Sequence, residues 1–319
     1  MNAPAITLED VHRRFGANEV LRGLSFSVRP GEVYALLGRN GAGKTTALRV
    51  ATGFLAPLQG RSTVLGCDSR ALTPALRERI GLVAEGQRMY SSMRVRDVIA
   101  FEAGTRRRFD RAYADRGVAR LGLPPGGRVL SLSRGMRAQL ALLLALAGRP
   151  EVLVLDDPAM GLDVVMRREF LDAVIDVLGE EGRSVLFSSH ILTDVERIAD
   201  RVGILHGGRL IVDATLDDLR RRVEKRFLSA DSEEERGRAL PGDVPGLLRA
   251  RARRGGWELT LLDWTLEREA ELRARGPRLS EPVAIGLEEL FLDLTTAAGD
   301  EVIGRPLPAP EAGAVEATR

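Results

Sequence analysis

Residues 32–46 read EVYALLGRNGAGKTT, an apolar segment followed by a glycine-rich loop that ends in Lys44 and Thr45. The segment Glu32–Leu37 is short, apolar and bounded by charge and glycine, which predicts a buried strand. The residues after the loop, Thr45–Ala51, predict a helix. The pattern G-x-x-x-x-G-K-T between a strand and a helix is the P-loop pattern, so this stretch predicts a phosphate-binding site.

Each residue type in this loop has a physical reason to bind phosphate. Glycines permit positive φ, so that backbone N–H groups can close around phosphate oxygens. The loop leads into a helix N-terminus, whose N–H groups and dipole favour an anion. We expect Lys44 to reach the outer phosphates and the Thr45 hydroxyl to hold Mg²⁺. The expected phosphate-binding residues are Gly38, Arg39, Asn40, Gly41, Ala42, Gly43, Lys44, Thr45 and Thr46.

The alternative for this loop is a glycine-rich turn without a ligand. Lysine usage argues against it, because Lys44 is one of only two lysines in the chain, the other being Lys225. The strand and helix on either side also fit a P-loop. A P-loop alone does not choose among GTPases, kinases, helicases and transport ATPases, so other motifs must narrow the class.

A second apolar segment, Val152–Leu155, ends in two carboxylates, Asp156 and Asp157. At the tip of a strand, Asp156 suits Mg²⁺ binding, directly or through water, and Asp157 could polarise an attacking water as a general base. Taken alone, the segment is equally consistent with a strand that ends in a helix-capping Asp-Asp-Pro. The function of these carboxylates therefore depends on the motifs around them.

Two further positions could face a nucleotide. Ser133 precedes the helical pattern Arg137–Ala147 and lies at an anion-ready helix N-terminus, although in isolation a plain N-cap is the better explanation. His190 follows the predicted strand Ser184–Ser188 and could contact a γ-phosphate, although a lone histidine is more often structural.

Composition excludes several classes of protein. The chain has 319 residues and a mass of 34.7 kDa, which suggests two domains. Its 47 basic and 45 acidic residues give a net charge of +2, so no nucleic-acid partner is expected. No run reaches the roughly 18 apolar residues of a membrane span, and no secretory signal is apparent. The single Cys67 excludes an internal disulfide framework, so we expect a cytoplasmic protein.

Short apolar segments alternate with helical patterns over the first two-thirds of the chain, which predicts an α/β fold with a mostly parallel sheet. We expect a first domain at residues 1–213 with a helical insert at about 88–149, a small α/β domain at 214–304 and a disordered tail at 305–319. A hairpin is expected over residues 202–212. Further helices are expected at Val164–Leu178, Thr193–Asp200, Leu219–Phe227 and around Leu287–Leu294.

Together these motifs resemble the ATP-binding subunit of an ABC transporter. The resemblance implies a P-loop NTPase fold that binds ATP and Mg²⁺ and hydrolyses ATP. The matching segments follow the family's order over about residues 5–215: the Walker A loop Gly38–Thr45, the signature Leu132–Gly135, the Walker B strand Val152–Asp156, the D-loop Gly161, Leu162 and Asp163, and the switch histidine His190.

The resemblance also implies a partner arrangement. In this family two cassettes form a head-to-tail dimer, and each ATP lies between one P-loop and the other chain's signature. That signature is Ser133, Arg134, Gly135 and Met136 here, and we expect a homodimer. Phe15 lies where an aromatic ring stacks on adenine, the alternative being core packing with Val11. Residues Gln87–Phe101 would face the transmembrane partner.

Three positions depart from the family pattern. Glu85 stands in place of the Q-loop glutamine, and its carboxylate could still approach Mg²⁺ or the attacking water. In the signature, Arg134 replaces a glycine and Met136 a glutamine. Asp157 replaces the usual glutamate and is one methylene shorter, which predicts slow hydrolysis. The expected catalytic residues are Asp157, His190 and Glu85, and the expected metal ligands are Thr45, Asp156 and Glu85.

The C-terminal region is similar to the accessory domain of ABC-2-type exporter subunits, in particular at Gly286–Leu292. We therefore expect an ATPase that powers an ABC-2-type exporter through separate transmembrane permease subunits, at the inner face of the cell membrane. The alternative is a nucleotide-gated regulatory or assembly module that binds ATP and dimerises with little hydrolysis. A soluble ABC protein that works on ribosomes or DNA is less consistent, because such proteins usually carry two cassettes or a long coiled-coil insert.

Overall fold

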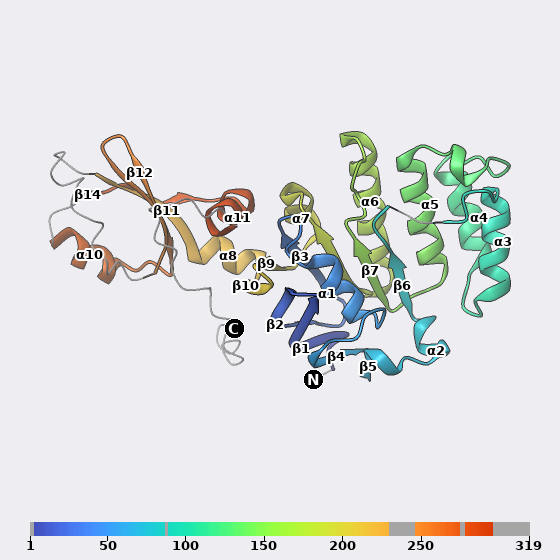
Figure 1. Ribbon diagram of the computed structural model, residues 1–319. Helices are drawn as coiled ribbons and strands as arrows, with labels where there is room; N and C mark the ends of the chain where they lie inside the picture. Colours follow the sequence, from blue (N-terminus) through green and yellow to red (C-terminus); the bar gives the residue numbers. More distant parts are fainter. Residues whose placement is uncertain (1–2, 87–88, 230–245, 275–277, 296–319) are drawn as a thin grey trace, which may run out of the picture. The chain divides into compact units, whose positions relative to one another are not determined.

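The computed structural model describes residues 3–86, 89–229, 246–274 and 278–295 (Figure 1). The chain forms two compact units, Met1–Leu210 and Ile211–Arg319. The expected disordered tail and Gln87 lie outside the described residues. Within the described residues, no helix combines the length and the apolar character that a membrane span requires.

A six-stranded sheet runs through the first unit, and its edge strand β10 continues across the unit boundary (Figure 1). The strand order is β10 (Arg209–Thr215), β9 (Arg201–His206), β3 (Val33–Gly38), β8 (Ser184–Ser189), β7 (Val152–Asp156) and β6 (Ile80–Val83). The pairs from β9 to β6 are parallel. The predicted strands at 32–37, 152–155 and 184–188 and the predicted hairpin are therefore confirmed. Since parallel strands share one direction, Gly38, Asp156 and Ser189 meet at the same edge of the sheet.

The predicted strands are buried along their whole length. Every residue of β3, β7 and β8 is buried, as expected for parallel strands covered on both faces. The predicted helices that follow them are present, and each end lies within three residues of the predicted one. In the described part of the first unit, the helices outside residues 89–149 are α1 (Lys44–Ala51), α2 (Pro74–Arg77), α6 (Val164–Glu181) and α7 (Leu192–Ile198).

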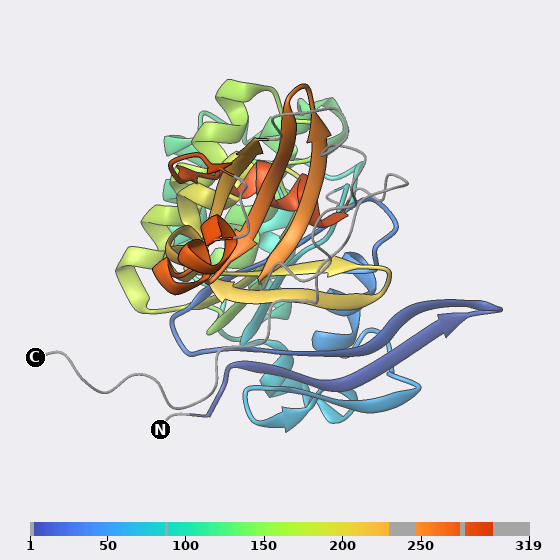
Figure 2. The same cartoon turned by 90° about the vertical axis from the view of Figure 1, so that its left-hand side faces the viewer.

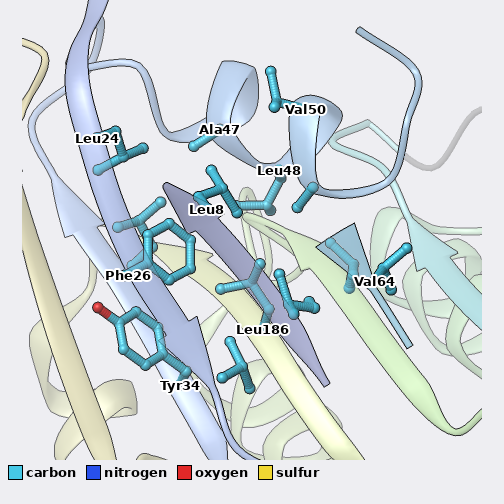
Figure 3. Close-up of a cluster of buried hydrophobic side chains, with 14 of the residues drawn as sticks. Leu8, Leu24, Phe26, Tyr34, Ala47, Leu48, Val50, Val64 and Leu186 are labelled. Atoms are coloured by element: carbon cyan, nitrogen blue, oxygen red, sulfur yellow. The ribbon is translucent and has the colours of Figure 1, made fainter. Parts of the chain in front are cut away.

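A second, antiparallel sheet packs against the first unit's core, and the sequence analysis did not anticipate it. Its strand order is β2 (Asn18–Val28), β1 (Ile6–Phe15), β4 (Gln59–Val64) and β5 (Cys67–Asp68). β1 and β2 form the long dark-blue hairpin of Figure 2. Alternate residues Leu24, Phe26 and Val28 are buried, and the Phe26 and Tyr34 rings stack with centroids 5.0 Å apart. Figure 3 shows this core, in which side chains of both sheets and of α1 meet.

Residues 89–149 form helices, and the described part of this stretch has no strand beyond an isolated bridge between Arg94 and Arg128. The helices are α3 (Val95–Thr105), α4 (Arg111–Arg120) and α5 (Arg134–Ala147). They share a hydrophobic core of their own, to which Ile99, Val118 and Leu140 contribute. These helices lie in the chain between β6 and β7, two strands that are neighbours in the sheet.

The second unit contains an antiparallel sheet with helices. The sheet consists of β12 (Leu247–Arg253), β13 (Gly256–Leu262), β11 (Val223–Ser229) and β14 (Arg278–Leu279), with β15 (Val283–Ala284) also paired to β11. The helices among its described residues are α8 (Leu216–Arg222), α10 (Leu266–Ala274) and α11 (Leu287–Thr295). The predicted helix at 287–294 is confirmed.

The predicted helix Leu219–Phe227 is wrong after Arg222. From Val223 onward the chain forms β11, which pairs along its whole length with β13. The charged residues Lys225 and Arg226 suggested a helix, but both are buried against acidic partners. Pairing with β13 therefore outweighs the local preference of these residues, as is common for strands.

A buried charge network lies between α11 and this sheet. The Asp293 carboxylate accepts a hydrogen bond from the Thr260 hydroxyl (2.7 Å) and lies 3.1 Å from Lys225 Nζ. Arg249 Nη1 lies 3.3 Å from the other carboxylate oxygen of Asp293. The side chain of Asp293 is 3% exposed, so these contacts replace its hydration and fix α11 on the sheet.

Candidate nucleotide-binding site

The glycine-rich loop joins the end of β3 to the start of α1. Gly43 is the N-cap residue of α1, has a φ of 109° and provides no side-chain cap for the helix. A Cβ at Gly43 would lie 3.0 Å from the Val20 carbonyl oxygen and from Leu21 Cδ2, so both conformation and space require glycine there. The first N–H groups of α1 are thus available to an anion, and the loop fits a phosphate group.

Lys44 lies along the loop instead of extending into solvent. Its Nζ donates hydrogen bonds to the carbonyl oxygens of Gly38 (2.7 Å) and Arg39 (3.3 Å), and the residue is 8% exposed. Burial lowers the pKa of Lys44, while the negative charges of Asp157, Asp156 and Glu85 act in the opposite direction. The ammonium group lies against the loop carbonyls, where an incoming phosphate could take over its hydrogen bonds.

The Asp156 carboxylate connects the loop to the sheet. Its Oδ1 accepts hydrogen bonds from the hydroxyls of Thr45 (3.1 Å) and Ser188 (2.9 Å). Ser188 Oγ also accepts a hydrogen bond from the backbone N–H of Asp157 (2.9 Å). The sequence analysis did not single out Ser188 as a site residue. Ser188 is recognised as a site residue only from the parallel register that pairs it with Asp156. That register is known only when β7 and β8 are placed side by side.

Asp157 and His190 form a close pair beyond the ends of β7 and β8. His190 Nδ1 lies 2.7 Å from Asp157 Oδ2, and the two side chains are 41% and 12% exposed. Asp157 has a φ of 43°, in the left-handed region that aspartate and asparagine tolerate better than most residues. The structure thus brings together the predicted residues Lys44, Asp156, Asp157 and His190, together with Glu85, whose charge acts on Lys44.

A family model described as "ABC transporter" matches residues 21–160. The daunorubicin resistance ATP-binding protein DrrA3 of Streptomyces coeruleorubidus is 37% identical over 223 residues, which cover 68% of this chain and 70% of that protein. The Nod factor export ATP-binding protein I of Rhizobium etli is 35% identical over 220 residues, which cover 67% and 69%. The chain belongs to the ABC transporter ATP-binding proteins.

Solved structures agree with this assignment. A structure entitled "Structure of ATP binding subunit of ABC transporter" superimposes with a TM-score of 0.60 and 27% identity, covering 68% of this chain and 92% of that chain. This ABC protein therefore binds ATP, and its ATPase domain implies hydrolysis. Members of the family dimerise and pair with permease subunits.

The predicted signature lies at the N-terminus of α5, where Ser133 is the N-cap residue. Ser133 Oγ accepts a hydrogen bond from the Met136 N–H (3.1 Å), and Arg134 is the first residue of the helix. Gly135 packs on Met166 of α6, since a Cβ at Gly135 would lie 1.9 Å from Met166 Cε. Among the described residues, no hydrogen bond or ion pair joins the signature to the phosphate-binding loop of the same chain.

The predicted D-loop lies beside the predicted signature. Asp163 caps α6 and accepts a hydrogen bond from the Met166 N–H (2.9 Å). A Cβ at Gly161 would lie 3.1 Å from Arg134 Nη1, so the arginine that departs from the family pattern reaches the D-loop. Met166 therefore contacts both motifs and holds them in one arrangement.

The ring of Phe15 lies at the end of β1 and is not part of the hydrophobic core. Phe15 is 49% exposed, whereas Val11 is fully buried. The guanidinium of Arg13 lies 5.1 Å from the ring centroid, so one face of the ring carries a cation–π contact. A cavity of about 420 Å³ lies between the loop residues 39–42, β2 and the turn at 206–208. An exposed aromatic ring on the same sheet as β2 suits a planar base.

Proposed function

We propose that this ABC protein powers an ABC-2-type exporter, through ATP-driven closure of a homodimer on separate permease subunits at the inner face of the cell membrane. The observation that carries the proposal is the arrangement of Lys44, Asp156, Asp157 and His190 at one edge of the sheet. Relatives named for daunorubicin resistance, Nod factor export and bacitracin transport support an export function. Because their cargoes differ chemically, we assign the choice of cargo to the permease.

The proposed nucleotide site uses the phosphate-binding loop and the acidic end of β7. Backbone N–H groups of residues 38–46 and the Lys44 ammonium would hold the phosphates, and Phe15 would stack on adenine. The Thr45 hydroxyl and Asp156, which already touch at 3.1 Å, would hold Mg²⁺, with Glu85 close enough to act on it. When bound, Mg²⁺ would offset the phosphates' negative charge.

In the proposed hydrolysis, Asp157 is the general base. His190 holds one oxygen of its carboxylate at 2.7 Å, which leaves the other oxygen to accept a proton from water. Aspartate is one methylene shorter than the glutamate usual in the family and holds its carboxylate more than about 1 Å further back. A misplacement of that size can lower the rate about 100-fold, so we propose slow hydrolysis.

The signature residues complete the site in the dimer. The N-terminus of α5, with Ser133, Arg134, Gly135 and Met136, would face the ATP of the partner subunit. Since the signature makes no hydrogen bond to the loop of its own chain among the described residues, an intermolecular role is consistent with its position. Arg134 would bring a positive charge and the D-loop residues Gly161, Leu162 and Asp163 to the same interface.

One observation favours a second function, a nucleotide-gated module with little turnover. The short Asp157 carboxylate is held by His190, at 2.7 Å from Nδ1. ATP hydrolysis measured against protein concentration separates the two functions. A rate that rises faster than linearly supports a dimeric motor, whereas dimerisation by ATP without turnover supports the module.

Replacing Lys44 with alanine is expected to weaken ATP binding about 10- to 150-fold, since a hydrogen bond to a charged group contributes about 1.5–3 kcal/mol. The measurement is titration with a fluorescent ATP analogue beside an ATPase assay. Arg49→Ala removes an exposed cation from the same helix and is the matched control, expected to bind ATP like the parent. The proposed site would be refuted by equal ATP affinity and turnover in Lys44→Ala and the parent.

A further inference from the structure

A second polar cavity lies at the opposite edge of the parallel sheet from the nucleotide site. Its volume is about 580 Å³, larger than the 420 Å³ beside the phosphate-binding loop. Ser184, Arg79 and Glu151 all line this cavity. Ser184 is the first residue of β8, and Arg79 and Glu151 immediately precede β6 and β7. Strands of five or six residues separate the two edges by roughly 15–20 Å, so this cavity is distinct from the ATP site.

Four arginines and one carboxylate line this cavity. Arg79 and Arg183 come from the edge of the sheet, while Arg108 and Arg149 come from the helical insert. Glu151 is the carboxylate, and it is held bidentately by Arg79 with two contacts of 2.6 Å. Arg108 shares Glu151 with Arg79, and Arg149 pairs with Asp110 outside the cavity wall, so these four arginines carry more charge than the two carboxylates.

Two of the arginines, Arg79 and Arg108, have more N–H donors than their contacts within the protein use. Arg79 uses Nε and Nη2 on Glu151. Arg108 donates from Nη1 to Glu151 (3.4 Å) and from Nη2 to the Arg149 carbonyl oxygen (3.2 Å). A guanidinium carries five N–H donors, so both side chains can bind a further acceptor. Arg149 Nη2 pairs with Asp110, which lies outside the cavity wall.

We propose that this cavity binds a small, multiply charged phosphate anion. Arginine forks match the tetrahedral oxygens of phosphate, and several of them around one cavity suit a ligand with more than one negative charge. Arg183 is only 9% exposed, so the site is recessed and fits a soluble anion rather than a flat membrane surface. A bound anion joins the helical insert to the edge of the sheet. The inference does not rest on the proposed exporter function.

Calorimetric titration of tripolyphosphate into the full chain tests the site, with Lys44→Ala present throughout to remove the P-loop as a competing site. Saturable binding is expected. Adding Arg108→Gln and Arg149→Gln is expected to lower affinity at least about tenfold, because each removes charge-assisted hydrogen bonds. Arg107→Gln is the matched control: Arg107 is exposed, adjacent in sequence and outside the cavity wall, and this change is expected to leave affinity within about twofold.

Absence of saturable binding, or an equal loss in the Arg107→Gln control, overturns the site. Hydrogen exchange of the unmutated chain gives a readout without substitutions. Tripolyphosphate is expected to protect the backbone at residues 149–151 and 182–184. Protection confined to residues 38–46 would show that only the P-loop binds the anion and would also overturn the proposal.

Discussion

Replacing Asp157 with asparagine is expected to lower the kcat of ATP hydrolysis about 100-fold or more and to leave ATP affinity within about twofold of the parent. A general base contributes about 10²–10⁴ to a rate, and the amide cannot accept the proton. Asparagine tolerates the positive φ at this position as aspartate does, and it can still accept a hydrogen bond from His190. The substitution therefore changes the proton acceptor with little change in the fold.

Single-turnover hydrolysis and ATP titration, run in parallel, measure this effect. Asp157→Glu is the informative comparison, because it restores the carboxylate reach that is usual in the family. It is expected to raise kcat above that of the parent if short reach limits the rate, partly offset by strain of about 1 kcal/mol or more from a longer side chain at positive φ. Unchanged kcat in Asp157→Asn would remove Asp157 from the proposed mechanism.

Replacing Asp293 with alanine is expected to destabilise the second unit by about 3–5 kcal/mol. The change leaves Lys225 and Arg249, 7% and 3% exposed, without the buried carboxylate that they share. Removing one member of a buried ionic network takes a partner from each remaining buried charge, which is why the cost exceeds that of a surface ion pair. Denaturant unfolding followed by tryptophan fluorescence reports this unit directly, because both tryptophans of the chain, Trp257 and Trp264, belong to it.

Glu288→Ala is the matched control for this experiment. Glu288 is an exposed acidic residue on the same helix α11, so its removal is expected to change the free energy of unfolding by less than about 0.5 kcal/mol. If Asp293→Ala were as stable as Glu288→Ala, the network would not stabilise the unit.

The pH dependence of this unit follows from Lys225. Burial by itself lowers the pKa of Lys225, but the hydrogen bond to Glu289 and the charges of Asp293 and Glu258 outweigh it, so the pKa is raised above its ordinary value of 10.5. A group whose pKa is higher in the folded than in the unfolded chain stabilises the fold below the unfolded pKa. This contribution is therefore present at neutral pH and is lost as pH rises above about 10.5.

The parts of the fold that could be predicted are those that a short run of adjacent residues identifies. An apolar run bounded by charge or glycine identified β3, β7 and β8, and the loop before Lys44 has a pattern that needs no tertiary information. β1 was missed because its register with β2 shifts at several points, which disrupts the alternation of apolar residues. β11 was taken for a helix because only its pairing with β13 explains the burial of Lys225 and Arg226.

The same distinction holds within the site. Lys44, Asp156, Asp157 and His190 could be named from their motifs, whereas Ser188 could not. Its function depends on which residue of β7 lies opposite it, and a shift of one residue would turn its hydroxyl to the other face. The arginine-lined cavity could not be predicted from the sequence either, because its four arginines come from four separate segments of the chain.

The hydrogen bonds around Asp156 bear on the entropy of catalysis. Thr45 can release Asp156 when the loop takes up a ligand, whereas Ser188 can keep its bonds to Asp156 and to the Asp157 N–H. The position of the Asp157 backbone is then the same before and after loading. The conformational entropy of the proposed general base is therefore lost once, during folding, and is not lost again in each turnover.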